Sequence, residues 1–216
     1  MVYCIAGFSV SPRSHVSCLP IDDDGSDFKF KGALLPNGGE LPWKIEGGFR
    51  LTPQTAPSSD SVYRFARLNR ARKTLPDYFL LSGAAPCTAQ PVRDCIEALE
   101  LDIHQFFSLT ILQPDMENVC GNYYILNVCQ MLDSIILEKS SLEAVIRPNG
   151  SYVQALTKNG KAWRTGKRSA VEGYHLWREK IYPSDIYISD MLYDIFMRNK
   201  FKGIDKHNFV KVDLEG

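Results

Sequence analysis

The side chains able to carry nucleophilic or acid–base chemistry are four histidines and scattered thiols and hydroxyls. The histidines are His15, His104, His175 and His207. A Cys or Ser nucleophile needs such a base within reach in the fold. The sequence has no GxSxG elbow, no HExxH, and no Walker-type or dinucleotide-binding glycine pattern. We therefore assign no catalytic residue, and a small hydrolase or transferase with a dispersed active site stays open as an alternative.

Two polar residues interrupt apolar sequence. His175 precedes Leu176, Trp177 and Arg178, and we expect it to be hydrogen-bonded and partly buried beside a core tryptophan. Asp133 is expected to serve the structure, at a capped turn.

The six cysteines form no CxxC pair, which argues against a zinc site or a disulfide framework. They are Cys4, Cys18, Cys87, Cys95, Cys120 and Cys129. We expect mostly buried, reduced thiols, with Cys95 in the core, and no metal or other cofactor.

Charge is balanced over the chain, with 25 Lys and Arg against 25 Asp and Glu, so any charged recognition must be local. One cationic stretch consists of Arg64, Arg67, Arg70, Arg72 and Lys73. It leaves a nucleic-acid-binding module open as a second alternative, although it lacks regularly spaced aromatic residues. We favour a solvated face that pairs with the acidic loops, and expect neither nucleic acid nor a membrane as partner.

Residues 174–212 organise the elements of the fold. Residues 186–188 favour a strand, Ser189 is a good helix N-cap, and residues 209–212 favour a closing strand. Between them, four residues follow at helical spacing, namely Leu192, Ile195, Phe196 and Asn199. Gly203 is expected to stop the helix.

A similar unit occupies residues 87–111, where Pro91 suits a first helical turn. Its helix face consists of Val92, Cys95, Ile96 and Leu99. Asp94 lies one hundred positions before Asp194, and residues 104–107 align with 207–210 after a three-residue shift. We interpret this as a weak internal duplication.

The remaining pattern indicates strands at 2–10, 28–31 and 123–128, a strand or helix at 62–68 and at 131–137, and a hairpin around Asn149-Gly150. Residues 158–168 are basic and contain glycine, which favours a loop. The fold class predicted is α+β, with a mixed, largely antiparallel sheet, short helices and two related strand-helix-strand lobes. We expect an irregular region at 1–61 and a domain at 62–216, with lobes near 75–140 and 170–214. The beginning of the chain lacks a signal-peptide pattern, so we expect the cytoplasm.

Several short motifs, in their order and spacing, resemble immunity protein family eleven of bacterial polymorphic toxin systems. They are Leu75-Pro76-Asp77-Tyr78, residues 92–99, residues 123–128, Leu132-Asp133-Ser134-Ile135, His175-Leu176-Trp177-Arg178, Ile188-Ser189-Asp190 and Phe201-Lys202-Gly203. The resemblance covers residues 64–212. It implies an inhibitor and not an enzyme, which binds a toxin delivered by a type VI or related contact-dependent system. It leaves the toxin and the oligomeric state open.

The toxin-binding residues that we predict follow from this resemblance and from charge. A toxin acting on nucleic acid or nucleotides usually carries a basic cleft, which local negative charge on an inhibitor would meet. The candidates are Asp22, Asp23, Asp24 and Asp27, followed by the surfaces around Trp43 and Trp163.

Overall fold

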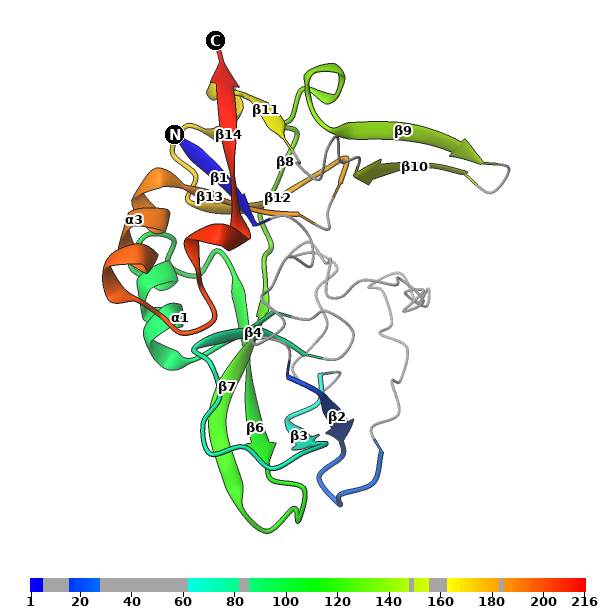
Figure 1. Ribbon diagram of the computed structural model, residues 1–216, viewed down its shortest axis with the longest axis vertical. Helices are drawn as coiled ribbons and strands as arrows, with labels where there is room; N and C mark the ends of the chain where they lie inside the picture. The colour runs from blue at the N-terminus through cyan, green and yellow to red at the C-terminus, as the bar shows by residue number, and fades with distance from the viewer. Residues whose placement is uncertain (6–15, 28–61, 82–85, 148–149, 156–162, 183–184) are drawn as a thin grey trace.

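The computed structural model of the protein describes residues 1–5, 16–27, 62–81, 86–147, 150–155, 163–182 and 185–216. Two six-stranded sheets lie one above the other along the long axis of the molecule (Figure 1). Helices α1 and α3 lie side by side where the sheets meet (Figure 1). Eight of the eleven strand pairings in the described residues are antiparallel. The predicted α+β class with two lobes is confirmed.

The first lobe contains α1 and a sheet of strand order β2-β3-β6-β7-β5-β4. Its elements are β2 (Cys18–Ile21), β3 (Phe65–Leu68), β4 (Tyr78–Leu80), β5 (Pro86–Thr88), α1 (Gln90–Glu97), β6 (Gln105–Leu112) and β7 (Val119–Asn127).

The second lobe contains α3 and a sheet of strand order β11-β14-β1-β13-β12-β8. Its elements are β1 (Val2–Ile5), β8 (Met131–Leu132), β11 (Arg164–Lys167), the short helix α2 (Arg168–Val171), β12 (Leu176–Glu179), β13 (Ile186–Ser189), α3 (Asp190–Asn199) and β14 (Phe209–Glu215). The 3-10 turns Leu137–Lys139 and Lys206–Asn208 connect its segments.

The two lobes repeat one topology. The chain order β4, β5, α1, β6 in the first lobe recurs as β12, β13, α3, β14 in the second. Five adjacent strands, β3-β6-β7-β5-β4, correspond to β11-β14-β1-β13-β12, and all four pairings between them agree in direction. The central strand differs in origin, because β7 follows β6 whereas β1 comes from the other end of the chain. The predicted duplication is therefore confirmed as a structural repeat.

The strand registers place residues one hundred positions apart at equivalent sites around the helices. Thr88 pairs with Tyr124 on the central strand, and Ile188 pairs with Tyr3. After each helix, equivalent residues of the two lobes lie 103 positions apart, since Phe107 pairs with Ile125 while Val210 pairs with Cys4. This is the three-residue shift that the sequence indicated.

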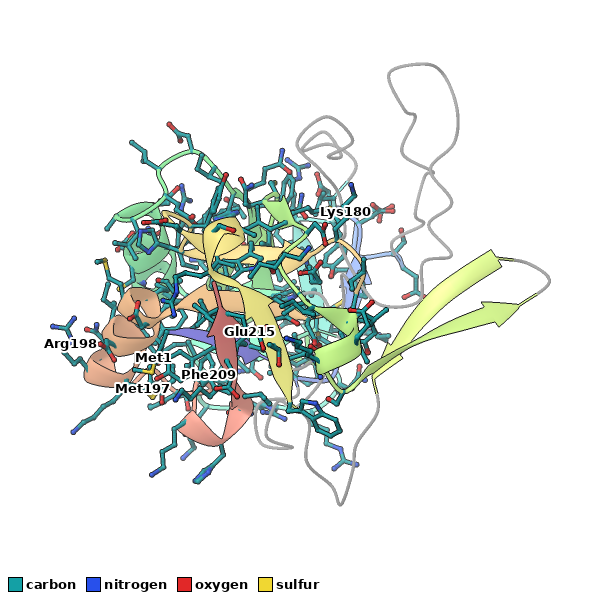
Figure 2. The ribbon with its side chains drawn as sticks, turned by 90° about the horizontal axis from the view of Figure 1, so that it is seen from above. Met1, Lys180, Met197, Arg198, Phe209 and Glu215 are labelled. Atoms are coloured by element: carbon teal, nitrogen blue, oxygen red, sulfur yellow. The ribbon has the colours of Figure 1, made fainter. Side chains whose placement is uncertain are left out.

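A helix side chain covers a tyrosine of the central strand in both lobes. In the first lobe the guanidinium carbon of Arg93 lies 4.6 Å from the Tyr124 ring centre. At the equivalent site the rings of Tyr193 and Tyr3 stack with their centres 3.8 Å apart. Phe209, labelled beside α3 in Figure 2, meets Tyr193 edge-on at 5.0 Å. At equivalent backbone positions, the second lobe thus has a stacked aromatic pair where the first lobe has a cation–π contact.

The two helices bury their predicted faces against each other and both sheets. Val92 and Ile96 of α1 and Leu192 and Phe196 of α3 belong to one apolar cluster at the junction of the lobes. A space of about 30 Å³ remains among these side chains. It is apolar and far smaller than a small-molecule pocket, which typically measures about 300–1,000 Å³. The cluster therefore holds the lobes together.

Each lobe also has a core of its own. That of the first lobe is built around Phe79, Ile111 and Ile125, and that of the second around Trp177 and Tyr187, whose rings lie parallel. Separate from both sheets is the hairpin of β9 (Leu142–Arg147) and β10 (Gly150–Ala155), which among the described strands pair only with each other. It projects sideways from the second lobe in both views (Figures 1 and 2).

Two local predictions were wrong. Residues 164–167, predicted as loop, form β11 parallel to β14, because the Arg164 side chain finds a buried partner instead of solvent. Helix α3 ends at Asn199, and Lys200, which adopts a left-handed conformation (φ 53°), caps it in place of Gly203. Gly203 has φ 93°, and a Cβ there would lie 1.9 Å from the Tyr78 carbonyl oxygen. The absence of a side chain at Gly203 therefore lets its segment pack closely against the segment of Tyr78.

The ambiguous segments are now resolved. Residues 65–68 are strand, and 131–137 divides into β8 and the start of a 3-10 turn. The predicted strand at 28–31 and most of the predicted region 1–61 lie outside the described residues, so the division at residue 61 stays a prediction. The described strands of that region, β1 and β2, pair with strands of both lobes.

Candidate functional site

The acidic segment forms a tight turn after β2. The Gly25 amide donates to the Asp22 carbonyl, the Asp22 amide donates to the Ser26 carbonyl, and Ile21 bridges to Asp27. The Asp24 carboxylate accepts from the Ser26 amide at 2.9 Å, and its hydrogen bonds to Ser26 lower the pKa of this exposed group. The turn thus carries its carboxylates on an ordered backbone.

Asp23 and Arg64 pair across this turn. Their side chains form an ion pair in which each is about two-thirds exposed. The start of the cationic stretch is therefore neutralised by the acidic segment, as the charge pattern favoured. Arg67 is half-buried on β3, whereas Arg70 and Lys73 are exposed. Nothing in this arrangement adds the aromatic platform that single-stranded nucleic acid requires.

One tryptophan candidate, Trp163, lies apart from the acidic turn. Trp163 is 42% exposed and directly precedes β11, at the edge of the second-lobe sheet. Its backbone is anchored, because its amide donates to the Ser141 hydroxyl oxygen and its carbonyl accepts from the Ser141 amide, both at 2.9 Å. Asp22–Asp27 adjoin β2, the edge strand of the other sheet. Trp43 lies outside the described residues.

A largely buried hydrogen-bond network joins the two lobes, linking the turn after α1 to the residue before β12 and to the N-cap of α3. The Cys129 amide donates to His104 Nδ1, so the ring proton resides on Nε2, which donates to Glu100 at 2.8 Å. The other Glu100 oxygen accepts from the His175 amide at 2.7 Å. His175 Nδ1 lies 2.9 Å from the Ser189 hydroxyl, which also accepts from the Leu192 amide as the helix cap.

This network confirms the interpretation of His175 as a partly buried, hydrogen-bonded histidine beside the fully buried Trp177. The sequence analysis missed Glu100. No helical spacing could have indicated it, because Glu100 and His104 lie in the turn after α1, where Asp102 has a left-handed conformation. Asp133 is exposed and pairs with Lys167 at 3.2 Å, in keeping with a structural role.

The second lobe buries an ion pair. Arg164 and Asp185 are each 1% exposed, with 2.7 Å between Nη2 and Oδ2. Arg164 also donates through Nη1 to the Ser141 hydroxyl. Burial is the largest single cause and lowers the pKa of the guanidinium, but the attraction and hydrogen bond of Asp185, together with Tyr187 and Cys4, raise the net pKa. Arg164 therefore stays charged in the interior.

A second buried carboxylate lies nearby. The Glu179 side chain accepts from the amide and hydroxyl of Ser134 at 2.9 and 2.7 Å. The Trp177 indole N–H donates to the same hydroxyl. These hydrogen bonds compensate a charge that would otherwise be costly in the interior.

Thiol chemistry is suppressed at the buried cysteines. Cys4, Cys18, Cys87 and Cys129 are buried, and burial raises the pKa of the Cys4 and Cys87 thiols well above the usual range. A thiol with a raised pKa is a poor nucleophile at neutral pH. Cys95 is half-buried, not fully in the core as expected. Among the described residues no group of three or more His, Cys, Asp or Glu side chains could hold a metal ion.

Residues 21–211 match the family described as immunity protein family (Imm11). The match includes both helices, the buried network and most of both sheets, so the chain belongs to this family. This confirms the resemblance drawn from the short motifs. A search of curated proteins found no match. None of the helices in the described part of the chain is long and apolar enough to cross a membrane.

Proposed function

We propose that the chain is an antidote that binds a cognate antibacterial toxin domain and neutralises it stoichiometrically. The family match over residues 21–211 carries this proposal. The toxin is delivered by a type VI or related contact-dependent system, and the antidote acts in the cytoplasm of the bacterial producer. The toxin chemistry that fits this location is that of a nuclease, a deaminase or a nucleotide-consuming enzyme.

The described chemistry supports inhibition over turnover. The Ser189 hydroxyl and His175 come within 2.9 Å, as in a nucleophile–base pair. However, Ser189 is 8% exposed and its oxygen caps α3. Among the described residues no carboxylate side chain contacts the imidazole of His175, so the orienting group of a triad is missing. The pair is better explained as structural.

Cells expressing the toxin domain encoded by the neighbouring upstream gene provide the test. The unmodified chain should restore growth, and His175→Gln and Ser189→Ala should still do so wherever thermal unfolding shows the fold to be intact. Lost protection, with both stability and toxin binding unchanged, would instead favour an enzyme. Failure of the unmodified chain to protect would contradict the proposed function itself.

A further inference from the structure

Exposed apolar side chains gather where the two lobes meet. Four of the nine large hydrophobic residues exposed in the described part of the chain are Leu101 (69%), Ile103 (44%), Tyr174 (38%) and Met191 (51%). We call these four residues the junction patch. They come from three segments, the turn after α1, the turn before β12 and the start of α3.

Buried hydrogen bonds bring these three segments together. The His175 amide donates to Glu100, one residue before Leu101. The Ser189 amide donates to the His175 carbonyl at 3.0 Å, which sets the start of α3 beside the same turn. The side chains of His104 and Glu100 beneath the patch are 0% and 8% exposed. The patch therefore stands on a fixed base, and little ordering would oppose binding.

The turns that carry the patch point into open space. Asp102, between Leu101 and Ile103, adopts a left-handed conformation with φ 59°. Gly173 has φ 85°, and a Cβ built there meets no atom within 4 Å. Both tips are thus accessible to a second protein.

The charged side chains of the three segments that carry the patch have one sign. Residues 98–103, 171–175 and 189–191 contain no Lys or Arg. Their exposed acidic residues are Asp102, Glu172 and Asp190. Asp190 pairs with the amino group of Met1, whereas Asp102 and Glu172 form no ion pair with a described residue. Because the whole chain has a net charge of zero, this negative charge is a property of the patch.

We infer that the junction patch is the surface that docks the toxin domain, and that the contacting face of the toxin carries Lys or Arg side chains around an apolar centre. This inference rests on the proposed function. An apolar centre with a polar rim is the usual anatomy of a recognition surface. Carboxylates at the rim select a basic partner and accelerate its association.

The apolar contribution is tested with a matched pair of double variants. Leu101→Ser/Met191→Ser removes apolar side chains from the patch, and Val119→Ser/Met116→Ser removes similarly exposed ones (58% and 41%) near the far turn of the first lobe. Calorimetric titration with the toxin domain encoded by the neighbouring gene should show Kd raised at least about 30-fold for the first variant, as expected for central contact residues. The second variant should bind within twofold of the unmodified chain, and both should melt near its Tm.

The charge contribution is tested with equal changes in net charge. Asp102→Asn/Glu172→Gln should slow association with the toxin domain at low salt by about 3–10-fold, and the difference should shrink at high salt. Glu117→Gln/Glu138→Gln alters two exposed carboxylates elsewhere and should leave the rate unchanged.

Several outcomes would overturn the inference. Patch variants that bind like the unmodified chain would exclude this surface, as would controls that weaken binding equally. A dimer seen by light scattering that Leu101→Ser/Met191→Ser dissociates would show that a second copy covers the patch. An unmodified chain that does not bind the toxin domain would overturn the proposed function together with the inference.

Discussion

The two lobes place the same strand order around one helix, but their interiors differ. Leu80 of the first lobe lies where the second has Arg178, as the shared registers show, and the residues that follow are the buried Leu81 and Glu179. Phe79 and Trp177, both fully buried, are equivalent in the same registers. The backbone topology thus accepts an apolar or a charged interior, provided that each buried charge has partners.

Two equivalent arginines differ in burial between the lobes. Arg64 and Arg164 lie one hundred positions apart, directly before β3 and at the first residue of the equivalent strand β11, and each pairs with an aspartate. Arg64 is 66% exposed, whereas Arg164 is 1% exposed. The equivalent arginines therefore form an ion pair at the surface of the first lobe and in the interior of the second.

The largest expected effect is the loss of the buried pair. Arg164→Met leaves the Asp185 carboxylate buried without its cation and should lower the free energy of unfolding by about 3–5 kcal/mol. Arg64→Met should change it by less than about 1 kcal/mol, since solvent screens that pair. Urea denaturation of both variants measures the difference. Equal effects would show that the lobes do not differ in this respect.

The helix faces should be about equally important in both lobes. Phe196 and Ile96 are 4% and 2% exposed at equivalent positions of the junction cluster. Phe196→Ala should cost about 3–5 kcal/mol and Ile96→Ala about 2–5 kcal/mol. Denaturation monitored by tryptophan fluorescence and by circular dichroism should give coincident transitions, because the cluster joins the lobes. Separate transitions would mean that the lobes unfold independently.

A smaller effect separates the two helix caps. Ser189 caps α3 through its hydroxyl, whereas Ala89 provides no side-chain hydrogen bond for α1. Ser189→Ala should destabilise the protein by about 1 kcal/mol, and Ala89→Ser should stabilise it by up to a similar amount. Thermal unfolding of the two variants checks this, and a destabilising Ala89→Ser would contradict the equivalence of the caps.

The acidic turn of the first lobe should affect stability least. Replacing Asp22, Asp23, Asp24 and Asp27 with Asn removes only exposed or partly exposed carboxylates and should leave the Tm nearly unaltered. If this turn contacts the toxin, association should slow and become less sensitive to salt. Unchanged kinetics at low and high salt would leave the junction patch as the better candidate surface.

Local patterns predicted the repeat because its signals are local. Ser189, the apolar spacing of α3 and its closing strand lie within about thirty residues, and the equivalent unit shows the same spacing. The sequence could not indicate that β1 completes the second sheet, since its paired residues in β13 and β14 lie 181–210 positions away. Such pairing depends on tertiary contacts.

The sequence did not indicate the buried charges either. The basic sequence around Arg164 resembles a solvated loop, because its partner Asp185 is distant in sequence and lies among apolar residues. The junction patch was missed for a similar reason. Leu101, Tyr174 and Met191 are unremarkable singly, and only the hydrogen bonds among Glu100, His175 and Ser189 bring them together.

The central claim, stoichiometric neutralisation, is tested most directly by titrating a fixed concentration of the neighbouring gene's toxin domain with the purified chain. With the toxin well above Kd, residual activity should fall linearly and reach zero at a fixed molar ratio of order one. It should stay at that level as incubation lengthens. Activity that disappears at a small fraction of that ratio, and falls further with time, would show turnover and contradict the account, as would activity that excess chain leaves unchanged.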